Sequence, residues 1–444
     1  MIFSFVLLVY FVIFFFIVKE IRTTLVFSFI VLSLFTPDLP IIWKIKFITL
    51  ENMFFILYSC YQIYKHRDGY NKFYIYHLTL ISILFIIFVL SVSFKPWDIS
   101  AIYNCLLFSC MSITVYEMIN STRMIKHIIY GLIPILIVYT LYGYLCYATS
   151  FNPMALYLST QFDSHFETVL MYSVEPRGGL SGRISGLTRH PLEYCSVLSS
   201  MVLLFLYAYK KKIIGVAIFI IVEFLCFSNS VLSGSRSGLI ALFVSILALL
   251  IFEKKFKIIM WIIASFPFIV GLLYILFPEQ SSFITSLVNP IEASDEVKGS
   301  DKSMRIEQLM GAIDLINDNL HHFWFGNGAG WSNHYLEKYG GHPVLLGFES
   351  IIFTGLVNFG VLGCLFYEIG HYVAFIFKFI KKSHYSVCVV IFFFILSLIT
   401  NSYGNITFVL VFSLILKDEL IRRNLSLRYQ KIINDKRKNS SIVY

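Results

Sequence analysis

Four arginines stand where polar stretches of the chain meet apolar ones. Two lie in GGLSGRISGLTRHP, one begins the apolar part of SGSRSGLIALF, and one follows in SMRIEQLMGAIDLIND; they are Arg183, Arg189, Arg236 and Arg305. An arginine beside an apolar segment is expensive to desolvate, so it usually reaches the interface or pairs with an anion. A guanidinium is always charged, and its planar fork of N–H donors matches pyrophosphate oxygens. Together these residues predict a site for a phosphate-containing lipid head group.

Glu193 follows Arg189 by four residues at the start of an apolar run. On a helix this spacing places both side chains on one face, where opposite charges attract. We therefore expect Glu193 to orient an arginine rather than to react. The eight cysteines of the chain are scattered, without Cys-x-x-Cys or Cys/His ligand spacing, so no metal site is predicted.

The composition defines the elements that must position these residues. The chain has 444 residues, of which 58% are hydrophobic and 14% are charged, and its mean hydropathy is +0.77. Soluble domains carry roughly 25% charged residues. Apolar runs of about twenty residues, each long enough to cross a bilayer core of about 30 Å, recur along the chain. The sequence predicts an all-α, polytopic integral membrane protein with a lipid membrane around it, because only helices satisfy their own backbone in lipid.

The formal net charge of +9 does not indicate nucleic-acid binding, because the basic residues form short clusters between apolar runs. Loops rich in lysine and arginine are typical of the cytoplasmic side of a membrane. The tail 417–444 holds eight Lys and Arg against three Asp and Glu, and it is predicted to be cytoplasmic. The other clusters lie at 65–72, 210–212, 253–257 and 378–382.

About twelve or thirteen transmembrane helices are expected in one domain over residues 1–444. The first apolar run lacks the features of a cleavable signal peptide and is interpreted as a span. The second candidate is weakened by Pro37, Asp38 and Pro40. The expected spans are 1–18, 23–42, 47–64, 73–94, 99–119, 127–148, 191–209, 213–228, 237–252, 258–277, 346–377, 384–400 and 402–416.

Two long segments, 149–190 and 278–345, then fall on the external side. The second holds nine Asp and Glu against four Lys and Arg, as expected of an external loop. Apolar residues recur at helical spacing over 303–318 and predict an amphipathic helix there. The glycines of FGNGAGW, at 325–331, are interpreted as tight turns, because no strand precedes them as a nucleotide-binding fingerprint would require.

The ordered motifs RISGLTRHP, SGSRSGLIAL, S-x-x-R followed by GNGAG, and GFESIIFTGLVNFGVLG resemble the O-antigen polymerase and ligase superfamily of membrane glycosyltransferases. The resemblance covers roughly residues 175–365. It implies an undecaprenyl-diphosphate-linked oligosaccharide as donor and acceptor, without metal, nucleotide or other cofactor. It also implies an active site on the external, periplasmic face of the bacterial cytoplasmic membrane, and a chain-length regulator protein as partner.

Residue by residue, Arg183 and Arg236 match the arginines thought to engage the donor diphosphate, and Arg305 matches the loop arginine. Ligases carry a His-Asn pair about eleven residues before the Gly of a closing Gly-x-x-Gly, where this chain has Glu349. A glutamate there resembles the polymerase branch, and a carboxylate can accept the proton of an attacking sugar hydroxyl. His342 and His334 are alternative bases.

We therefore expect a polymerase of lipid-linked repeat units for O-antigen, a lipopolysaccharide component, or for capsule. Two alternatives remain. One is an O-antigen ligase or a related glycan transferase to another acceptor. The other is a lipid-glycan flippase without chemistry, although a flippase more naturally shows repeated halves, short loops and charges within its spans.

Overall fold

The computed structural model describes residues 2–35, 44–45, 48–66, 72–91, 96–161, 170–171, 173–174, 182–188, 190–265, 302–339, 350–400 and 405–440. The elements of the first half are α1 (Ile2–Val18), α2 (Ile21–Phe35), β1 (Lys44–Ile45), β2 (Ile48–Thr49), α3 (Leu50–Lys65), α4 (Lys72–Leu90), α5 (Pro96–Met118), α6 (Thr122–Thr149) and α7 (Pro153–Gln161). Those of the second half are α9 (Pro191–Lys210), α10 (Val216–Leu232), α11 (Arg236–Phe252), α14 (Lys302–Asp314), α15 (Leu320–Phe325), α16 (Trp331–Tyr339), α17 (Ile351–Gly363), the π-helix η2 (Cys364–Ile369), α18 (Gly370–Phe379), α19 (His384–Thr400) and α20 (Asn405–Ser440).

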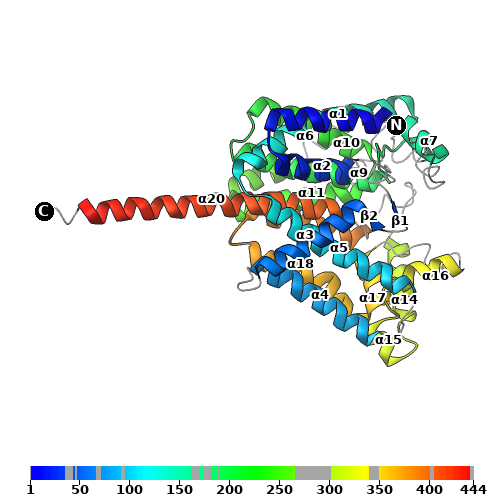
Figure 1. Ribbon diagram of the computed structural model, residues 1–444. Helices are drawn as coiled ribbons and strands as arrows, with labels where there is room; N and C mark the ends of the chain where they lie inside the picture. The colour runs from blue at the N-terminus through cyan, green and yellow to red at the C-terminus, as the bar shows by residue number, and fades with distance from the viewer. Residues whose placement is uncertain are drawn as a thin grey trace.

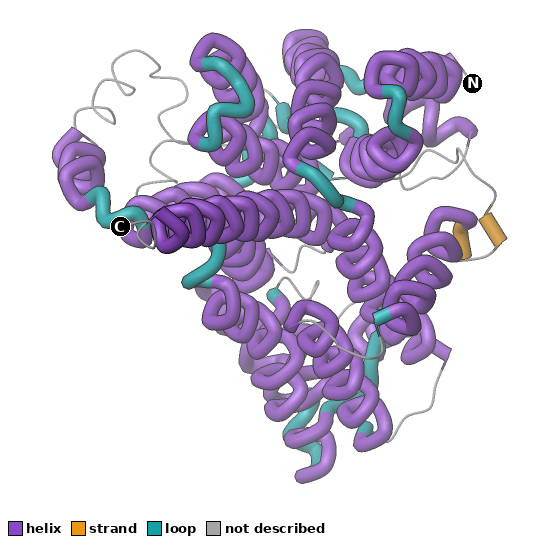
Figure 2. Tube along the Cα trace, turned by 60° about the vertical axis from the view of Figure 1, so that its left-hand side comes forward, coloured by secondary structure: helices purple, strands orange, loops and turns teal. Residues whose placement is uncertain are grey.

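The prediction of an all-α, polytopic membrane protein is confirmed. By length and hydropathy, four helical stretches in the described residues can cross a membrane, and seven shorter apolar helices accompany them. The only strands in this part of the chain are β1 and β2, an antiparallel pair of two residues each at the periphery (Figure 2). The four long stretches are Phe73–Leu90, Thr122–Thr149, Pro191–Lys210 and Ile351–Phe379.

The two ends of the helix bundle differ in character (Figure 1). Helices α9 and α11 both begin at the end that also carries α7, α14 and α16, which we call the loop end. Helix α20 leaves the bundle at the opposite end, which we call the tail end. Lys65, Lys210 and Lys378 lie in the last turns of α3, α9 and α18. The basic clusters of the sequence thus gather at one end, as a shared cytoplasmic side requires.

Helix α9 forms the centre of the bundle. All side chains of residues 194–205 are buried, and α9 packs against α10, α11, α19 and α20. Its serines Ser196, Ser199 and Ser200 are fully enclosed, and small residues of this kind let neighbouring helices approach closely. Gly238 of α11 shows how close the approach is: a Cβ atom there would lie 2.5 Å from the Sγ of Cys195.

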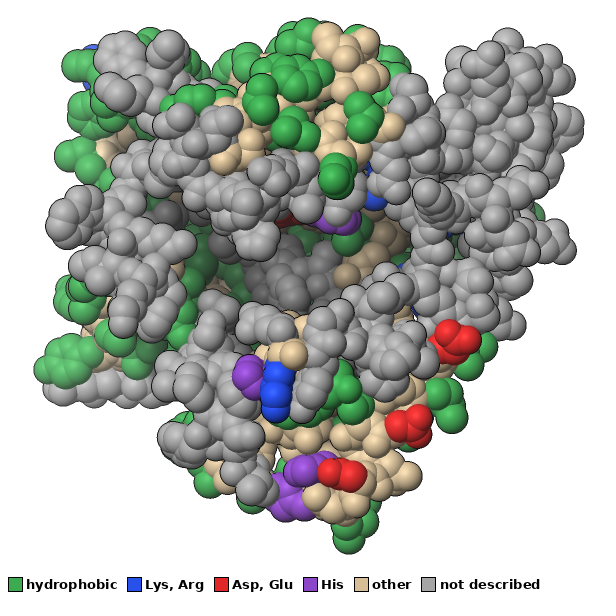
Figure 3. Space-filling model, turned by 90° about the vertical axis from the view of Figure 1, so that its right-hand side faces the viewer, with side chains coloured by type: hydrophobic (Ala, Val, Ile, Leu, Met, Phe, Trp, Pro, Cys, Tyr) green, Lys and Arg blue, Asp and Glu red, His purple; other side chains and the backbone are tan. Residues whose placement is uncertain are grey.

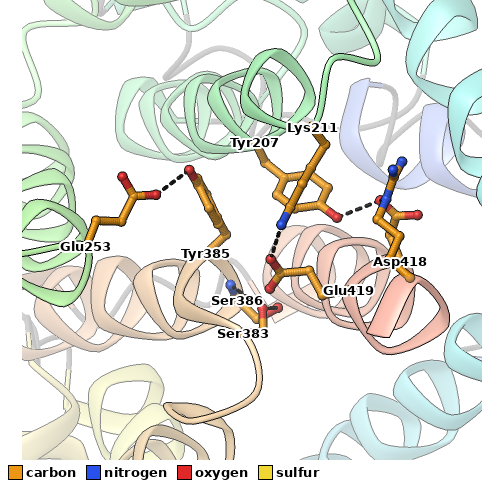
Figure 4. Close-up of polar contacts among 9 residues, drawn as sticks. Tyr207, Lys211, Glu253, Ser383, Tyr385, Ser386, Asp418 and Glu419 are labelled. Carbon is orange, nitrogen blue, oxygen red and sulfur yellow. Dashed lines mark hydrogen bonds and ion pairs between the residues drawn. The ribbon is translucent and has the colours of Figure 1, made fainter. Parts of the chain in front are cut away.

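A polar network fixes α20 to α9 at the tail end (Figure 4). The hydroxyl of Tyr207 donates a hydrogen bond of 2.5 Å to Asp418, which is fully buried. Arg422 lies 2.8 Å from the same carboxylate. Lys211 forms a 2.9 Å ion pair with Glu419, the next residue of α20. A buried carboxylate is costly unless it is paired in this way, so these partners define where α20 must cross α9.

A second group of polar contacts joins α11 to α19 at the tail end. The hydroxyl of Tyr385 donates a 2.7 Å hydrogen bond to Glu253 (Figure 4). Glu253 also pairs with Lys255. Burial alone would favour the neutral form of Glu253, but the hydrogen bonds from Lys255 and Tyr385 outweigh it and lower the pKa of this carboxyl below its ordinary value. Because α19 begins where α11 ends, the two helices run antiparallel.

The span expected over 346–377 corresponds to the apolar helical stretch Ile351–Phe379, but the chain reverses direction within it. Gly360 has φ 64° and ψ −170°, which is not helical, so α17 consists of two helices joined at this glycine. The part before Gly360 packs back against η2, where the Cγ of Glu368 would lie 2.9 Å from a Cβ on Gly355. Hydropathy could not reveal this hairpin, because the residues around the turn, apart from Asn358, are apolar or small.

The glycine-rich stretch between α15 and α16 holds the tip of this hairpin. Gly326, Gly328 and Gly330 all have positive φ, which confirms the expected tight turns. The backbone N–H of Gly328 donates a 2.9 Å hydrogen bond to the carbonyl of Asn358. Glycine is required on both sides, because a Cβ on Gly360 would lie 2.5 Å from the backbone nitrogen of Phe325.

Candidate functional site

Arg183 lies inside the protein rather than at its surface. Its side chain is only 5% exposed, and its Nε donates a 3.2 Å hydrogen bond to the carbonyl of Ser233. The neighbouring Ile184 donates its backbone N–H to the carbonyl of Leu232. The segment around Arg183 therefore runs along the end of α10 and satisfies carbonyls that a helix end leaves without partners.

Arg236 begins α11 just after the same turn. The connection from α10 to α11 has only three residues, Ser233, Gly234 and Ser235, and Gly234 takes a positive φ of 63°. The Cγ of Arg183 would lie 3.2 Å from a Cβ on Gly234, so its side chain lies directly over this turn. The structure thus brings together two of the predicted arginines, which are far apart in the sequence.

The first turn of α11 adds partial positive charge at this place. The N-cap residue Ser235 makes no side-chain capping hydrogen bond to the helix, and the first turn contains no acidic residue. The exposed amides and the dipole of a helix N-terminus favour an anion. Half-buried Arg236 occupies the first position of this turn, so its full charge adds to that of the helix end.

Helix α9 begins beside this region with a histidine cap. The Nδ1 atom of His190 accepts a 3.1 Å hydrogen bond from the backbone N–H of Leu192, and Pro191 takes the first helical position. Glu193 lies half-buried in the first turn. Helix α9 begins at Pro191, so Arg189 precedes it in the sequence, and the expected pairing of Arg189 with Glu193 stays a prediction. Arg189 itself lies outside the described residues.

The loop end faces the viewer in Figure 3 and is hollowed near its centre. Acidic, histidine and basic side chains are visible at the upper wall of the hollow, and hydrophobic side chains are visible at its sides. Arg183, Arg236, His190 and Glu193 all belong to segments that end or begin at this end of the bundle. A recess with convergent polar groups in an apolar surrounding is the usual form of a ligand site.

Arg305 lies on α14 and holds this helix to the end of α19. Its Nη1 donates a 2.6 Å hydrogen bond to the carbonyl of Ile399, in the last turn of α19. Because α19 and α11 are antiparallel and packed together, this carbonyl lies at the same end of the pair as Arg236. Arginine at a helix C-terminus is stabilising, so Arg305 has a structural task beside the predicted ligand role.

The amphipathic helix expected over 303–318 is confirmed as α14, Lys302–Asp314, although it ends earlier. Its apolar face does not lie free on a membrane surface. Ala312 packs in a cluster with Phe353 and Val357 of α17, and Leu309 packs against the same cluster. The large loop is therefore fastened to the hairpin through α14, and to α19 through Arg305.

The predicted bases are placed only in part. His334 is half-buried on α16, and its backbone N–H donates to Gly330. Glu349 and His342 lie outside the described residues. Ser350, which follows Glu349 in the sequence, is buried and N-caps α17 by accepting a 3.1 Å hydrogen bond from Ile352. No group of three or more His, Cys, Asp or Glu suited to a metal occurs among the described residues.

Two polar contributors were missed by the sequence analysis. Ser233 fixes the turn between the arginines, and Asn358 accepts a 2.9 Å hydrogen bond from the backbone of Ser332 while its own carbonyl receives Gly328. Ser233 stands in a serine-rich stretch, where the sequence does not distinguish it from its neighbours. Asn358 could have been noticed in the sequence as a candidate for a polar contact, because an amide within an apolar run seldom stays without a partner.

A family model described as O-Antigen ligase matches residues 221–367, about a third of the chain. The match spans Arg236, Arg305 and the hairpin, and it begins after Arg183 and Glu193. It supports the O-antigen polymerase and ligase superfamily and, with it, a membrane enzyme that processes glycans. A comparison with curated proteins finds no match. With the helical bundle, these findings describe a multi-pass membrane protein with a region similar to the O-Antigen ligase family.

Proposed function

We propose that the protein polymerises lipid-linked oligosaccharide repeat units in a bacterial cytoplasmic membrane. The observation that carries the proposal is that buried Arg183 and half-buried Arg236 converge on one turn. This turn leads into the start of α11, which has no side-chain capping hydrogen bond. Two guanidinium groups at a helix N-terminus match the charge and oxygen geometry of a diphosphate. In this proposal, the diphosphate that these cationic groups hold at the loop end of the protein is the head group of a polyprenyl carrier.

In the proposed reaction the hydroxyl at the non-reducing end of a new repeat unit attacks the anomeric carbon of the growing glycan. A new glycosidic C–O bond forms, and the bond between the anomeric carbon and the diphosphate oxygen breaks. The electron pair of that bond leaves with undecaprenyl diphosphate, whose added charge Arg183 and Arg236 stabilise. Glu349 accepts the hydroxyl proton, with His342 or His334 as alternatives. Such general-base assistance contributes about 10² to 10⁴ in rate.

The proposal favours polymerisation over ligation on one sequence feature. Glu349 stands where the ligases that the chain resembles carry a His-Asn pair. A carboxylate at this position of the sequence can accept the proton of an attacking sugar hydroxyl. The acceptor is then another lipid-linked repeat unit at the external face, and a separate chain-length regulator protein completes the system. Neither metal nor nucleotide is assigned a role, since the diphosphate is already a good leaving group.

The test deletes the gene in its native host and restores wild type, Arg236→Ala, Glu349→Gln or the control Arg423→Ala. Arg423 is an exposed arginine at the tail end, so its loss changes the charge without touching the loop end. Surface polysaccharide is separated by gel, and the membrane level of each variant is measured. We expect deletion, R236A and E349Q to leave single repeat units, while R423A restores long chains.

Two other outcomes reject the proposal in different ways. Full-length chains stranded on the lipid carrier after deletion identify a ligase. Repeat units trapped on the cytoplasmic face, with normal chain length among those that cross, identify a flippase. Normal polymer from E349Q at normal protein level leaves polymerisation standing but removes Glu349 as the base.

A further inference from the structure

The turn between α10 and α11 is held by more bonds than a simple connection needs. Ser233 is fully buried, and its Oγ donates a 2.6 Å hydrogen bond to the carbonyl of Ser230. The same Oγ accepts a 3.2 Å hydrogen bond from the backbone N–H of Ser235. The hydroxyl thus joins the last turn of α10 to the residue just before Arg236.

The carbonyl of Ser233 holds the other arginine. It accepts the 3.2 Å hydrogen bond from Nε of Arg183, in a place where the arginine is 95% removed from solvent. A guanidinium is planar, so fixing Nε sets the plane in which its remaining N–H groups point. One residue therefore sets the orientation of Arg183 through its backbone and the path to Arg236 through its side chain.

Gly234 completes the arrangement by leaving room. Its φ of 63° is adopted at little cost only by glycine, and a Cβ there would lie 3.2 Å from Cγ and 3.4 Å from Nε of Arg183. Alanine at this position would displace the arginine and strain the turn together. The close approach of Arg183 to the backbone thus depends on the missing side chain.

We propose that Ser233 and Gly234 are positioning residues that preset the spacing and orientation of Arg183 and Arg236 for a diphosphate. The proposal rests on the proposed function, and it adds the device that prepares the site before the lipid arrives. Preorganised donors are valuable because no free energy is then spent on arranging them when the ligand binds or the transition state forms. Neither residue contacts the ligand itself.

The chain offers matched controls for both positions. Ser230 is also fully buried on α10, but its Oγ donates to the carbonyl of Cys226, within its own helix, and not to the residues of the turn. Gly215 precedes α10 at the opposite end, and a Cβ there would have nothing within 4 Å. Ser230→Ala and Gly215→Ala therefore repeat the chemical changes without touching the turn.

The experiment measures binding of undecaprenyl diphosphate and of undecaprenyl monophosphate to the purified full-length protein in nanodiscs. Ser233→Ala is expected to weaken diphosphate binding roughly 2- to 10-fold, the worth of one buried hydrogen bond. Gly234→Ala is expected to weaken it about 10-fold or more, because strain adds to displacement. The diphosphate is affected more than the monophosphate, since the spacing of two arginines matters only for two phosphates. S230A and G215A bind as wild type does.

A double-mutant cycle separates positioning from general loosening, and it does not depend on G234A folding. Arg236→Lys keeps the charge but loses the rigid fork, and S233A removes the hydroxyl that sets the path to this residue, so S233A should add little further loss in the R236K background. Losses that simply add, or S233A and G234A binding like their controls, overturn the positioning role while leaving the polymerase proposal intact. Failure of wild type to prefer the diphosphate overturns both.

Discussion

Arg305 shows how one residue can serve the fold while standing near a ligand site. Its guanidinium bonds to the carbonyl of Ile399, so it fastens α14 to α19. We expect Arg305→Gln to lower the free energy of unfolding by about 1 kcal/mol, the typical worth of a hydrogen bond that is partly exposed. The measurement is thermal unfolding in detergent, with Arg423→Gln as the control at an exposed arginine.

Binding distinguishes the structural task of Arg305 from the ligand role predicted for it. If R305Q unfolds at the wild-type temperature but binds undecaprenyl diphosphate more weakly, the residue acts on the ligand and its bond to α19 is incidental. If both properties change together, the attachment of the large loop to α19 through Arg305 is coupled to the ligand site.

Glu253 gives a pH dependence to the tail end. Its pKa in the folded protein lies below the ordinary value of 4.5, so its interactions stabilise the fold above that pH. This stability is lost as the pH falls through the folded pKa, when the carboxyl takes up a proton and releases Lys255. We expect the thermal unfolding temperature to fall below about pH 4.5.

Glu253→Gln supplies the comparison, because glutamine keeps the shape and cannot titrate. Its unfolding temperature should be lower at neutral pH and should change less across the same acidic range. Identical curves for the two proteins would remove Glu253 from the acid response.

The arginine site was partly predictable from single residues. A charged side chain at the edge of an apolar run is conspicuous in a sequence. The position of Arg183 beside the turn that leads into α11 agrees with this signal. The role of Ser233 was not predictable, because its carbonyl becomes important only through Arg183, 50 positions away in the sequence.

At the scale of elements, the hairpin of α17 and η2 depends on two facing glycines. Gly360→Ala is expected to destabilise the protein by about 2 kcal/mol or more, because it combines a positive φ with a clash against backbone atoms that cannot move aside. The readout is the amount of folded protein in the membrane and its unfolding temperature. Gly215→Ala, in open space, should behave as wild type.

A normal G360A protein would mean that the chain runs through position 360 as one continuous helix. That result would restore the single span expected from hydropathy and would separate the glycine-rich turn from the hairpin tip. The same variant therefore tests the one element for which the sequence prediction and the structure disagree.

Most helix positions were predictable, because long apolar runs have few alternatives in lipid. The bounds of α9, α11 and α19 follow the expected spans closely, since a proline, an arginine or a histidine marks where each begins. The reversal at Gly360 was not predictable, because glycine occurs in straight membrane helices as well as in turns. Only the contacts of Gly326 and Asn358 distinguish a turn at Gly360 from a straight helix through it.

At the scale of the whole molecule, the separation of loop end and tail end predicts opposite accessibility across the membrane. Lys338→Cys on α16 should react in intact cells with a maleimide that cannot cross membranes. Arg423→Cys on α20 should react only after the cells are permeabilised. Both native side chains are exposed, so the difference reports sidedness rather than burial.

Wild type provides the background for this labelling, because it retains its own cysteines, including exposed Cys60 on α3. Labelling of R423C but not K338C in intact cells would invert the orientation. The site would then face the cytoplasm, and the external lipid-linked donor of the proposed reaction would be excluded.

The bond from Tyr207 to Asp418 joins residues that are 211 positions apart. Ribosomes add about 5 to 20 residues per second, so α9 must wait about 10 to 40 seconds for its partner on α20 to be synthesised. During biogenesis Tyr207 and Lys211 therefore face lipid or another helix without the carboxylates that later pair with them. A chain that stops before α20 would carry this unmatched polar surface permanently, and the cell could recognise it there as unfinished and degrade it.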